Sequence, residues 1–158
     1  MNSKELKTKT LHYYRFRKQF KFISTEAGRW ESDVLVSNGK EIIEIETKAT
    51  VADFKNDFKK KKHEVYNKPT TYHLANTVPS KFFFCVPQDM VSDVLPLLEN
   101  TPYGLLSCLE GKITKRGVFI QIIKDSKVFN QKTAKKLLHK LILRMGSELI
   151  RMRIKYLV

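Results

Sequence analysis

Cysteine, long apolar runs and negative charge are all scarce in this chain of 158 residues. Its two cysteines, Cys85 and Cys108, match no metal-binding spacing and cannot build a disulfide framework, so we expect both to be reduced. No apolar run approaches the roughly 20 residues that cross a bilayer. The N-terminus is charged from Lys4 onward, without an apolar leader segment. These absences exclude disulfide-rich, membrane-spanning and secreted proteins and predict a cytoplasmic one.

Several familiar catalytic patterns are missing as well. The six glycines are scattered and form no phosphate-binding loop. The chain has neither the Gly-x-Ser-x-Gly turn of serine hydrolases nor the His-Glu-x-x-His pair of zinc proteases. Its four histidines share no pattern. The chemistry therefore has to be sought among carboxylates and lysines.

Positive charge is abundant but unevenly placed. Thirty basic residues against sixteen acidic ones give a net charge of +14. Residues 23–54 nevertheless carry a net charge of −4, whereas residues 1–22, 55–68 and 112–158 carry +6, +4 and +11. The total predicts a polyanionic partner, with nucleic acid favoured over a membrane surface. An acidic island in such a chain calls for a cation, which a nucleic-acid enzyme would supply as a bound metal.

The order of expected elements predicts a mixed α/β fold. We expect an amphipathic helix over residues 4–20, a short strand over 20–25 and a short helix over 89–99. Residues 81–86 are almost continuously apolar and predict a central buried strand, followed by strands at 104–109 and 118–123. Residues 131–158 are expected to be helical, with Gly146-Ser147 kinking or dividing the helix. With no convincing linker, residues 1–158 are taken as one domain.

A hairpin is the clearest local feature. Residues 33–37 and 41–48 alternate with a period of two around Asn38-Gly39, a strong dipeptide for a two-residue turn. That turn would place Asp33 opposite Glu44 and diagonal to Glu46, about 5 and 7 Å away. Lys48 shares the face of the two glutamates. Carboxylates and one lysine would thus converge at the open end of the hairpin.

This convergence predicts a metal site. Close carboxylates repel each other unless a counter-charge is present, and Mg²⁺ or Mn²⁺ is the cation that such oxygens prefer. Lys48 could orient an attacking water or neutralise a phosphate under attack. The alternative is an exposed strand with Glu and Lys on its wet side and Ile on its dry side.

The next segment predicts a basic helix that runs from Thr50, as N-cap, to about Tyr66. One stripe of this helix is polar and aromatic, and His63 beside it could touch phosphate. The stripe is equally compatible with an ordinary solvated surface, and a histidine placed like His63 is more often a solvated helix residue. The residues that we expect to contact nucleic acid are Lys55, Lys59, Lys62, His63 and Tyr66.

Asp33, twelve further residues and then Glu46-Thr47-Lys48 resemble the D…(D/E)xK signature of the PD-(D/E)xK superfamily, which has the restriction-endonuclease-like fold. More closely, residues 25–106 resemble the MmcB-like DNA repair proteins of that superfamily. The matching blocks, in order along the chain, are 25–26, 29–35, 45–50, 53–54, Asp57, Lys60, Tyr66, 81–87, 95–96 and 104–106.

The resemblance implies roles for individual residues. Asp33 and Glu46 would bind the metal together with the carbonyl of Thr47, and Lys48 would be the catalytic lysine. Glu26 would be the additional upstream carboxylate that some superfamily members use. Lys62 and Tyr66 are placed like a polar pair that often lines this active site. Many enzymes of this fold act as dimers, so a homodimer stays open.

The sequence thus predicts a restriction-endonuclease-like α/β fold that binds Mg²⁺ or Mn²⁺ and hydrolyses DNA, in repair or in phage DNA processing. Two alternatives remain. One is a non-catalytic nucleic-acid-binding domain of the same fold, which would bind DNA in a salt-sensitive way without metal-dependent turnover. The other is an interaction protein whose basic faces contact an acidic partner. We expect no membrane association.

Overall fold

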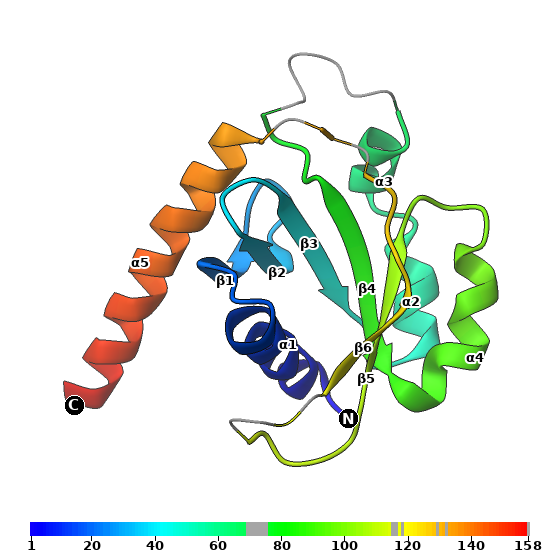
Figure 1. Cartoon of the computed structure of the whole chain (residues 1–158), viewed down its shortest axis with the longest axis horizontal. Coiled ribbons are helices and arrows are strands. Elements are labelled where there is room, and N and C mark those ends of the chain that lie inside the picture. Colours follow the sequence, from blue (N-terminus) through cyan, green and yellow to red (C-terminus); the bar gives the residue numbers. More distant parts are fainter. Residues whose placement is uncertain (69–75, 115–116, 118, 129, 132, 158) are drawn as a thin grey trace.

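The computed structural model describes residues 1–68, 76–114, 117, 119–128, 130–131 and 133–157. Six strands in these ranges form one open sheet whose neighbours follow chain order (Figure 1). The central pairs β3–β4 and β4–β5 are parallel, and the remaining pairs are antiparallel. The strands are β1 (Phe22–Ala27), β2 (Ser32–Ser37), β3 (Ile42–Thr47), β4 (Lys81–Pro87), β5 (Gly104–Cys108) and β6 (Ile120–Lys124). Val118, expected at the start of β6, lies outside the described residues.

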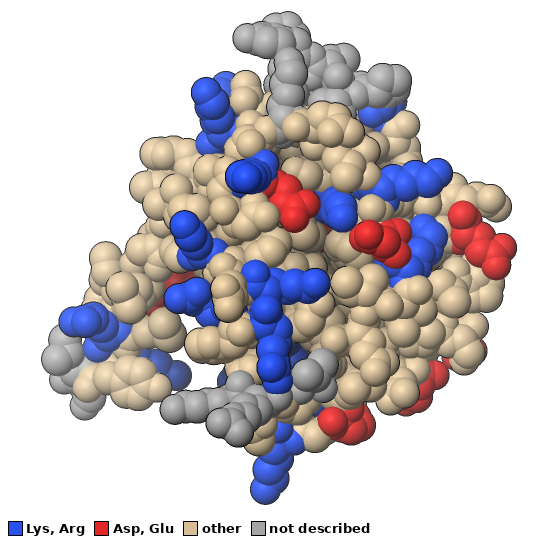
Figure 2. Space-filling model, viewed as in Figure 1, with Lys and Arg blue, Asp and Glu red and all other residues tan. Residues whose placement is uncertain are grey.

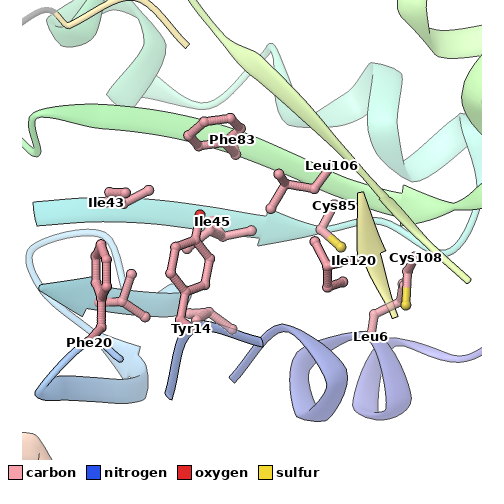
Figure 3. Close-up of a cluster of buried hydrophobic side chains, with 12 residues drawn as sticks. Leu6, Tyr14, Phe20, Ile43, Ile45, Phe83, Cys85, Leu106, Cys108 and Ile120 are labelled. Carbon is pink, nitrogen blue, oxygen red and sulfur yellow. The ribbon is translucent and has the colours of Figure 1, made fainter. Parts of the chain in front are cut away.

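Helices cover both faces of the sheet, which confirms the mixed α/β fold (Figure 1). The α-helices are α1 (Ser3–His12), α2 (Val51–Asp57), α3 (Lys61–Tyr66), α4 (Val91–Val94) and α5 (Lys135–Leu157). A π-helical turn, Tyr13–Arg17, extends α1, and 3₁₀ turns at Gln88–Met90 and Leu95–Leu98 flank α4. Apolar side chains of α1 pack on one face with Ile45, Cys85 and Leu106 (Figure 3). The opposite face carries α2, α3 and α4 over β4 and β5, and α5 over β1 and β2.

β4 is the buried central strand that its apolar sequence predicts. Every residue after Lys81 is buried. Phe83 and Cys85 point into the core beneath α1, whereas Phe82 and Phe84 point into the core beneath α2 and α4. Because β3 runs parallel beside β4, its own side chains also alternate between two covered faces.

The hairpin forms, but its expected register is wrong. Four residues, 38–41, connect β2 to β3, because the Asn38 side-chain oxygen accepts hydrogen bonds from the backbone N–H of Lys40 and of Glu41. Leu35 therefore lies opposite Glu44. Continuing this register places Asp33 across from Glu46, one pair closer to it than the sequence predicts.

The single helix expected up to Tyr66 is two helices. The Thr50 hydroxyl accepts a hydrogen bond from the Asp53 N–H at 3.1 Å, which confirms the N-cap. However, α2 ends at Asp57, and Lys60 adopts an extended conformation with φ −71° and ψ 137°. The break turns the side chain of Lys62 inward, where it meets buried carboxylates of β3.

α5 is continuous through Gly146-Ser147, so these residues do not divide it. Arg144 donates a hydrogen bond to the Thr25 carbonyl, and the Glu148 carboxylate accepts one from the Thr25 N–H. These two contacts cover part of the exposed edge of β1. Within the described residues, no helix is long and apolar enough to cross a membrane.

Candidate functional site

Charged side chains of β3 are buried beneath α2 and α3. Glu44, Glu46 and Lys48 share one face of the strand, as the sequence predicts, and are 2, 3 and 9% exposed. Buried charges are unfavourable unless each one has a partner. The partners come from the two short helices that follow.

Lys62 of α3 lies between the two glutamates. Its Nζ is 3.0 Å from Glu44 Oε1 and 2.5 Å from Glu46 Oε1, and its side chain is 1% exposed. Burial by itself would lower the pKa of Lys62, but the charges of Glu44, Glu46 and Asp57 outweigh burial and hold this pKa above its ordinary value. Tyr66 donates a hydrogen bond of 2.6 Å to the second oxygen of Glu44. Lys62 therefore stays charged and joins α3 to β3 through two buried ion pairs.

Asp57, the last residue of α2, is a second centre of ion pairs. Its Oδ1 lies 2.5 Å from the Nζ of Lys48 and 2.6 Å from the Nζ of Lys60. Its Oδ2 lies 2.8 Å from His63 Nε2, and His63 Nδ1 lies 2.9 Å from the Tyr103 hydroxyl. Burial would raise the pKa of Asp57, but the hydrogen bond to His63 and the neighbouring lysines hold it well below its usual range.

Asp33 is fixed at the end of the hairpin. Its Oδ2 accepts hydrogen bonds of 2.9 Å from both the N–H and the hydroxyl of Thr47. Its Oδ1 lies 2.8 Å from Lys7 of α1. Burial would raise the pKa of Asp33, but Lys7 and Thr47 lower it below its ordinary value. The carboxylate is thus held charged and in one orientation.

Glu26 approaches the same corner from β1. It has no partner in the ladder between the pairs Thr25–Val34 and Ala27–Ser32, and its φ is +49°. One residue on each strand, Glu26 and Asp33, lies between those pairs, so the register places Glu26 beside Asp33, and a positive φ is uncommon for a residue other than glycine. Glu26 pairs with Lys7, which therefore bridges Glu26 and Asp33.

A cavity of about 370 Å³ opens beside these groups, at the carboxyl end of β3. It is lined by Ser3, Asp33, Thr47, Lys48, Ala49, Asp53, Asn56, Asp57 and Lys60. Crevices at the carboxyl ends of parallel strands are where α/β proteins commonly bind ligands. Glu46 lies behind this lining, where its Oε2 contacts Lys48 at 3.2 Å and Lys60 at 3.4 Å.

Of the expected catalytic residues, Asp33 and Lys48 line this cavity together with Thr47, and Glu46 lies behind its lining in contact with Lys48. The expected nucleic-acid contacts do not form one stripe, which corrects the prediction. Lys55 and Lys59 are exposed on α2 and just after it. The residues turned inward by the helix break are Lys62, His63 and Tyr66.

Three residues of the site, Asp57, Lys60 and Lys7, were not expected from the sequence. Asp57 and Lys60 lie among the blocks that resemble the MmcB-like proteins, and that resemblance was the available signal. Lys7 belongs to a helix whose pattern predicts only an amphipathic face. Its contact with Asp33 depends on how α1 crosses the sheet, which local pattern does not determine.

The donor atoms suit a hard divalent cation. Asp33, Glu46 and Asp57 supply carboxylate oxygens, the type of ligand that Mg²⁺ and Mn²⁺ prefer. As placed, no three acidic, histidine or cysteine side chains in the described part of the chain stand together as a metal cage. Lysine ammonium groups hold each carboxylate instead. The residues therefore offer suitable ligand atoms for a divalent cation, and lysine ammonium groups would have to move away for the cation to bind.

Basic side chains extend beyond the cavity. On the face shown in Figure 2, Lys and Arg are spread from the left to the upper right, whereas most of the visible Asp and Glu lie toward the right, partly among basic side chains. Lys55, Lys59 and Lys61 are exposed on and between α2 and α3, and Lys59 donates a hydrogen bond to Asn56, which lines the cavity. A polyanion approaching this side would meet positive charge first.

Comparison with known proteins adds information about the fold. No family model matches the chain, and no curated protein does. A solved structure of a protein of unknown function from Silicibacter pomeroyi is similar, with a TM-score of 0.65 over 97% of this chain and 92% of that chain. The two sequences are 18% identical, so the likeness concerns the fold.

Proposed function

We propose that this protein is a divalent-metal-dependent nuclease that hydrolyses phosphodiester bonds in DNA. The observation that supports it best is the placement of Asp33, Asp57 and Lys48 on the lining of one cavity, with Glu46 directly behind. Carboxylates and a lysine at a concave site are the groups that metal-dependent phosphodiester cleavage requires. The net charge of +14 and the resemblance to DNA repair proteins support DNA as the substrate.

Each residue has a task in this proposal. Asp33 and Glu46 would hold Mg²⁺ or Mn²⁺, and the bound metal would make a water molecule more acidic and stabilise charge on the phosphate. Lys48, held by Glu46 and Asp57, would orient the water or neutralise the phosphate oxygens. Thr47 keeps Asp33 charged and fixed. Buried, unpaired Cys85 and Cys108 suit a cytoplasmic location.

Cleavage of supercoiled plasmid and of labelled oligonucleotides, in Mg²⁺, Mn²⁺ or EDTA, tests the proposal. Asp33→Asn, Glu46→Gln and Lys48→Met should each reduce metal-dependent cleavage by about a hundredfold or more while DNA binding persists. Glu41→Gln, which removes a carboxylate at the far end of the same hairpin, should cleave like the wild type. Full activity in all three site variants would refute the assignment.

A second function is favoured by the ion pairs themselves. Because lysines neutralise each site carboxylate, the domain could bind DNA without cutting it. That function predicts salt-sensitive DNA binding and no cleavage in any divalent cation, with equal binding in Mg²⁺ and EDTA.

A further inference from the structure

Lys60 occupies the entrance of the cavity and bridges two buried carboxylates. Its Nζ is 2.6 Å from Asp57 Oδ1 and 3.4 Å from Glu46 Oε2. The lysine side chain is 50% exposed, whereas those of Asp57 and Glu46 are 0 and 3% exposed. The ammonium group of Lys60, carried on a half-exposed side chain, thus lies between the two buried carboxylates.

The oxygen that Lys60 contacts on Asp57 is poised for a cation. Asp57 Oδ1 is buried, and neither its contact with Lys60 nor its contact with Lys48 has the angles of a hydrogen bond. The attraction is therefore mainly between charges, without a directed proton. The other oxygen is held by His63, itself in contact with Tyr103, so Oδ1 stays directed at the cavity.

We propose that a divalent cation binds here by replacing the Lys60 ammonium, with Asp57 and Glu46 as its carboxylate ligands. This inference rests on the proposed function and extends it. Asp57 joins the ligands expected from the sequence, and Lys60 becomes a built-in competitor of the metal. Lys48 and Lys62 stay in place, because both are almost fully buried.

Charge and solvation favour this exchange at Lys60. A divalent cation doubles the attraction to two carboxylates, and Mg²⁺ keeps part of its water shell, which bridges an imperfect fit. The Lys60 side chain is half exposed, so it can swing into solvent with little rearrangement of the core. Lys7 also bridges two carboxylates, but Glu26 is 44% exposed and Asp33 Oδ2 accepts two hydrogen bonds from Thr47. A cation in place of Lys7, between Glu26 and Asp33, would therefore gain less than one in place of Lys60.

The test is Mn²⁺ binding measured without DNA, by calorimetry and by electron paramagnetic resonance. Lys60→Met should bind Mn²⁺ at least about tenfold more tightly than the wild type, because its competing charge is gone. Lys140→Met is the matched control. It removes an equal charge from an exposed lysine of α5, a helix that packs over β1 and β2 rather than beside the cavity, and its affinity should match the wild type.

Equal Mn²⁺ affinities for Lys60→Met and Lys140→Met would overturn the proposal. Asp57→Asn should weaken binding by at least about tenfold, as expected for a lost ligand, and wild-type affinity in this variant would also overturn it. If Asp57→Asn does not fold, as judged by circular dichroism, the lysine pair decides.

These measurements separate the inference from the proposed function. If Lys60→Met binds Mn²⁺ more tightly and Asp57→Asn more weakly, but no variant cleaves DNA, the cation site stands and the nuclease proposal fails. If DNA is cleaved while both substitutions leave Mn²⁺ affinity unchanged, the nuclease proposal stands and this cation site is refuted.

Discussion

Lys62 shows how single residues hold the site together. A lysine with 1% exposure is tolerated because Glu44 and Glu46 contact its ammonium and Tyr66 satisfies the remaining oxygen of Glu44. Burial and the Glu44 charge raise the pKa of Tyr66 well above its ordinary value, so its hydroxyl remains a donor. At this scale the site is a network of buried charges in which each member depends on its neighbours.

Removing Lys62 should therefore be severe. Lys62→Met leaves two buried carboxylates without their shared cation, and we expect the free energy of unfolding to fall by about 3–5 kcal/mol. Lys61→Met, the exposed neighbour on the same helix, should change it by less than about 0.5 kcal/mol. Urea denaturation at neutral pH measures both. Similar losses of stability in the two variants would contradict the claim that the buried ion pairs of Lys62 stabilise the fold.

The depressed pKa of Asp57 predicts how stability depends on pH. Its folded pKa lies below the ordinary value of 3.8, so the charged form is stabilised by folding. That stabilisation is complete above about pH 5 and is lost as the pH falls below 3.8 toward the folded pKa. The stability difference between the wild type and Asp57→Asn should thus shrink in acid. A constant difference in urea denaturation from neutral pH down to about pH 2.5 would contradict this.

At the scale of elements, the sequence predicts those features that depend only on neighbouring residues. The apolar run of β4, the cap at Thr50 and the shared face of Glu44, Glu46 and Lys48 all follow from local sequence. The hairpin register does not, because the Asn38 side chain closes a four-residue connection that a dipeptide rule overlooks.

The break between α2 and α3 has a similar explanation. Residues 51–66 read as one helix because their lysines resemble a solvated stripe. The local pattern does not show that buried carboxylates of β3 lie beneath this segment. The ion pairs of Lys62 with Glu46 and of His63 with Asp57 form at the expense of a continuous helix. The sequence therefore predicts the part of the site that lies on the hairpin, but not the part that α2 and the following residues supply.

α5 offers a test of packing at this scale. Leu141 is fully buried against β1 and β2, whereas Ile150, farther along the same helix, is 60% exposed. Leu141→Ala should lower the free energy of unfolding by about 2–5 kcal/mol. Ile150→Ala should change it by about 0.5 kcal/mol or less. Thermal or urea unfolding compares the pair, and equal effects would mean that α5 does not pack on the sheet as described.

For the whole molecule, charge and cavity act together. The excess of positive charge surrounds an acidic island, and the structure buries two carboxylates of that island, Glu44 and Glu46, in a network of ion pairs beside the cavity. Under the proposed function, the exposed lysines Lys55 and Lys59, on α2 and just after it, would hold the phosphate backbone. A DNA strand guided by them would present its phosphates to the cavity.

Binding of DNA should then depend steeply on salt. Lys55→Met with Lys59→Met should weaken DNA binding and reduce the slope of log affinity against log salt by up to about 2. Lys81→Met, at the opposite end of β4 from the cavity, should alter neither. Fluorescence anisotropy over a salt series measures both quantities. An unchanged slope in the double variant would place the DNA elsewhere.

The central claim is that the cavity beside β3 is a divalent-cation site of a nuclease. A crystal of the protein soaked in Mn²⁺, with anomalous diffraction to locate the ion, tests it most directly. We predict Mn²⁺ in the cavity, about 2.0–2.3 Å from carboxylate oxygens of at least two of Asp33, Glu46 and Asp57, with Lys48 within reach of a water on the metal. A crystal with Mn²⁺ bound elsewhere, and with Lys60 still between Asp57 and Glu46, would contradict it.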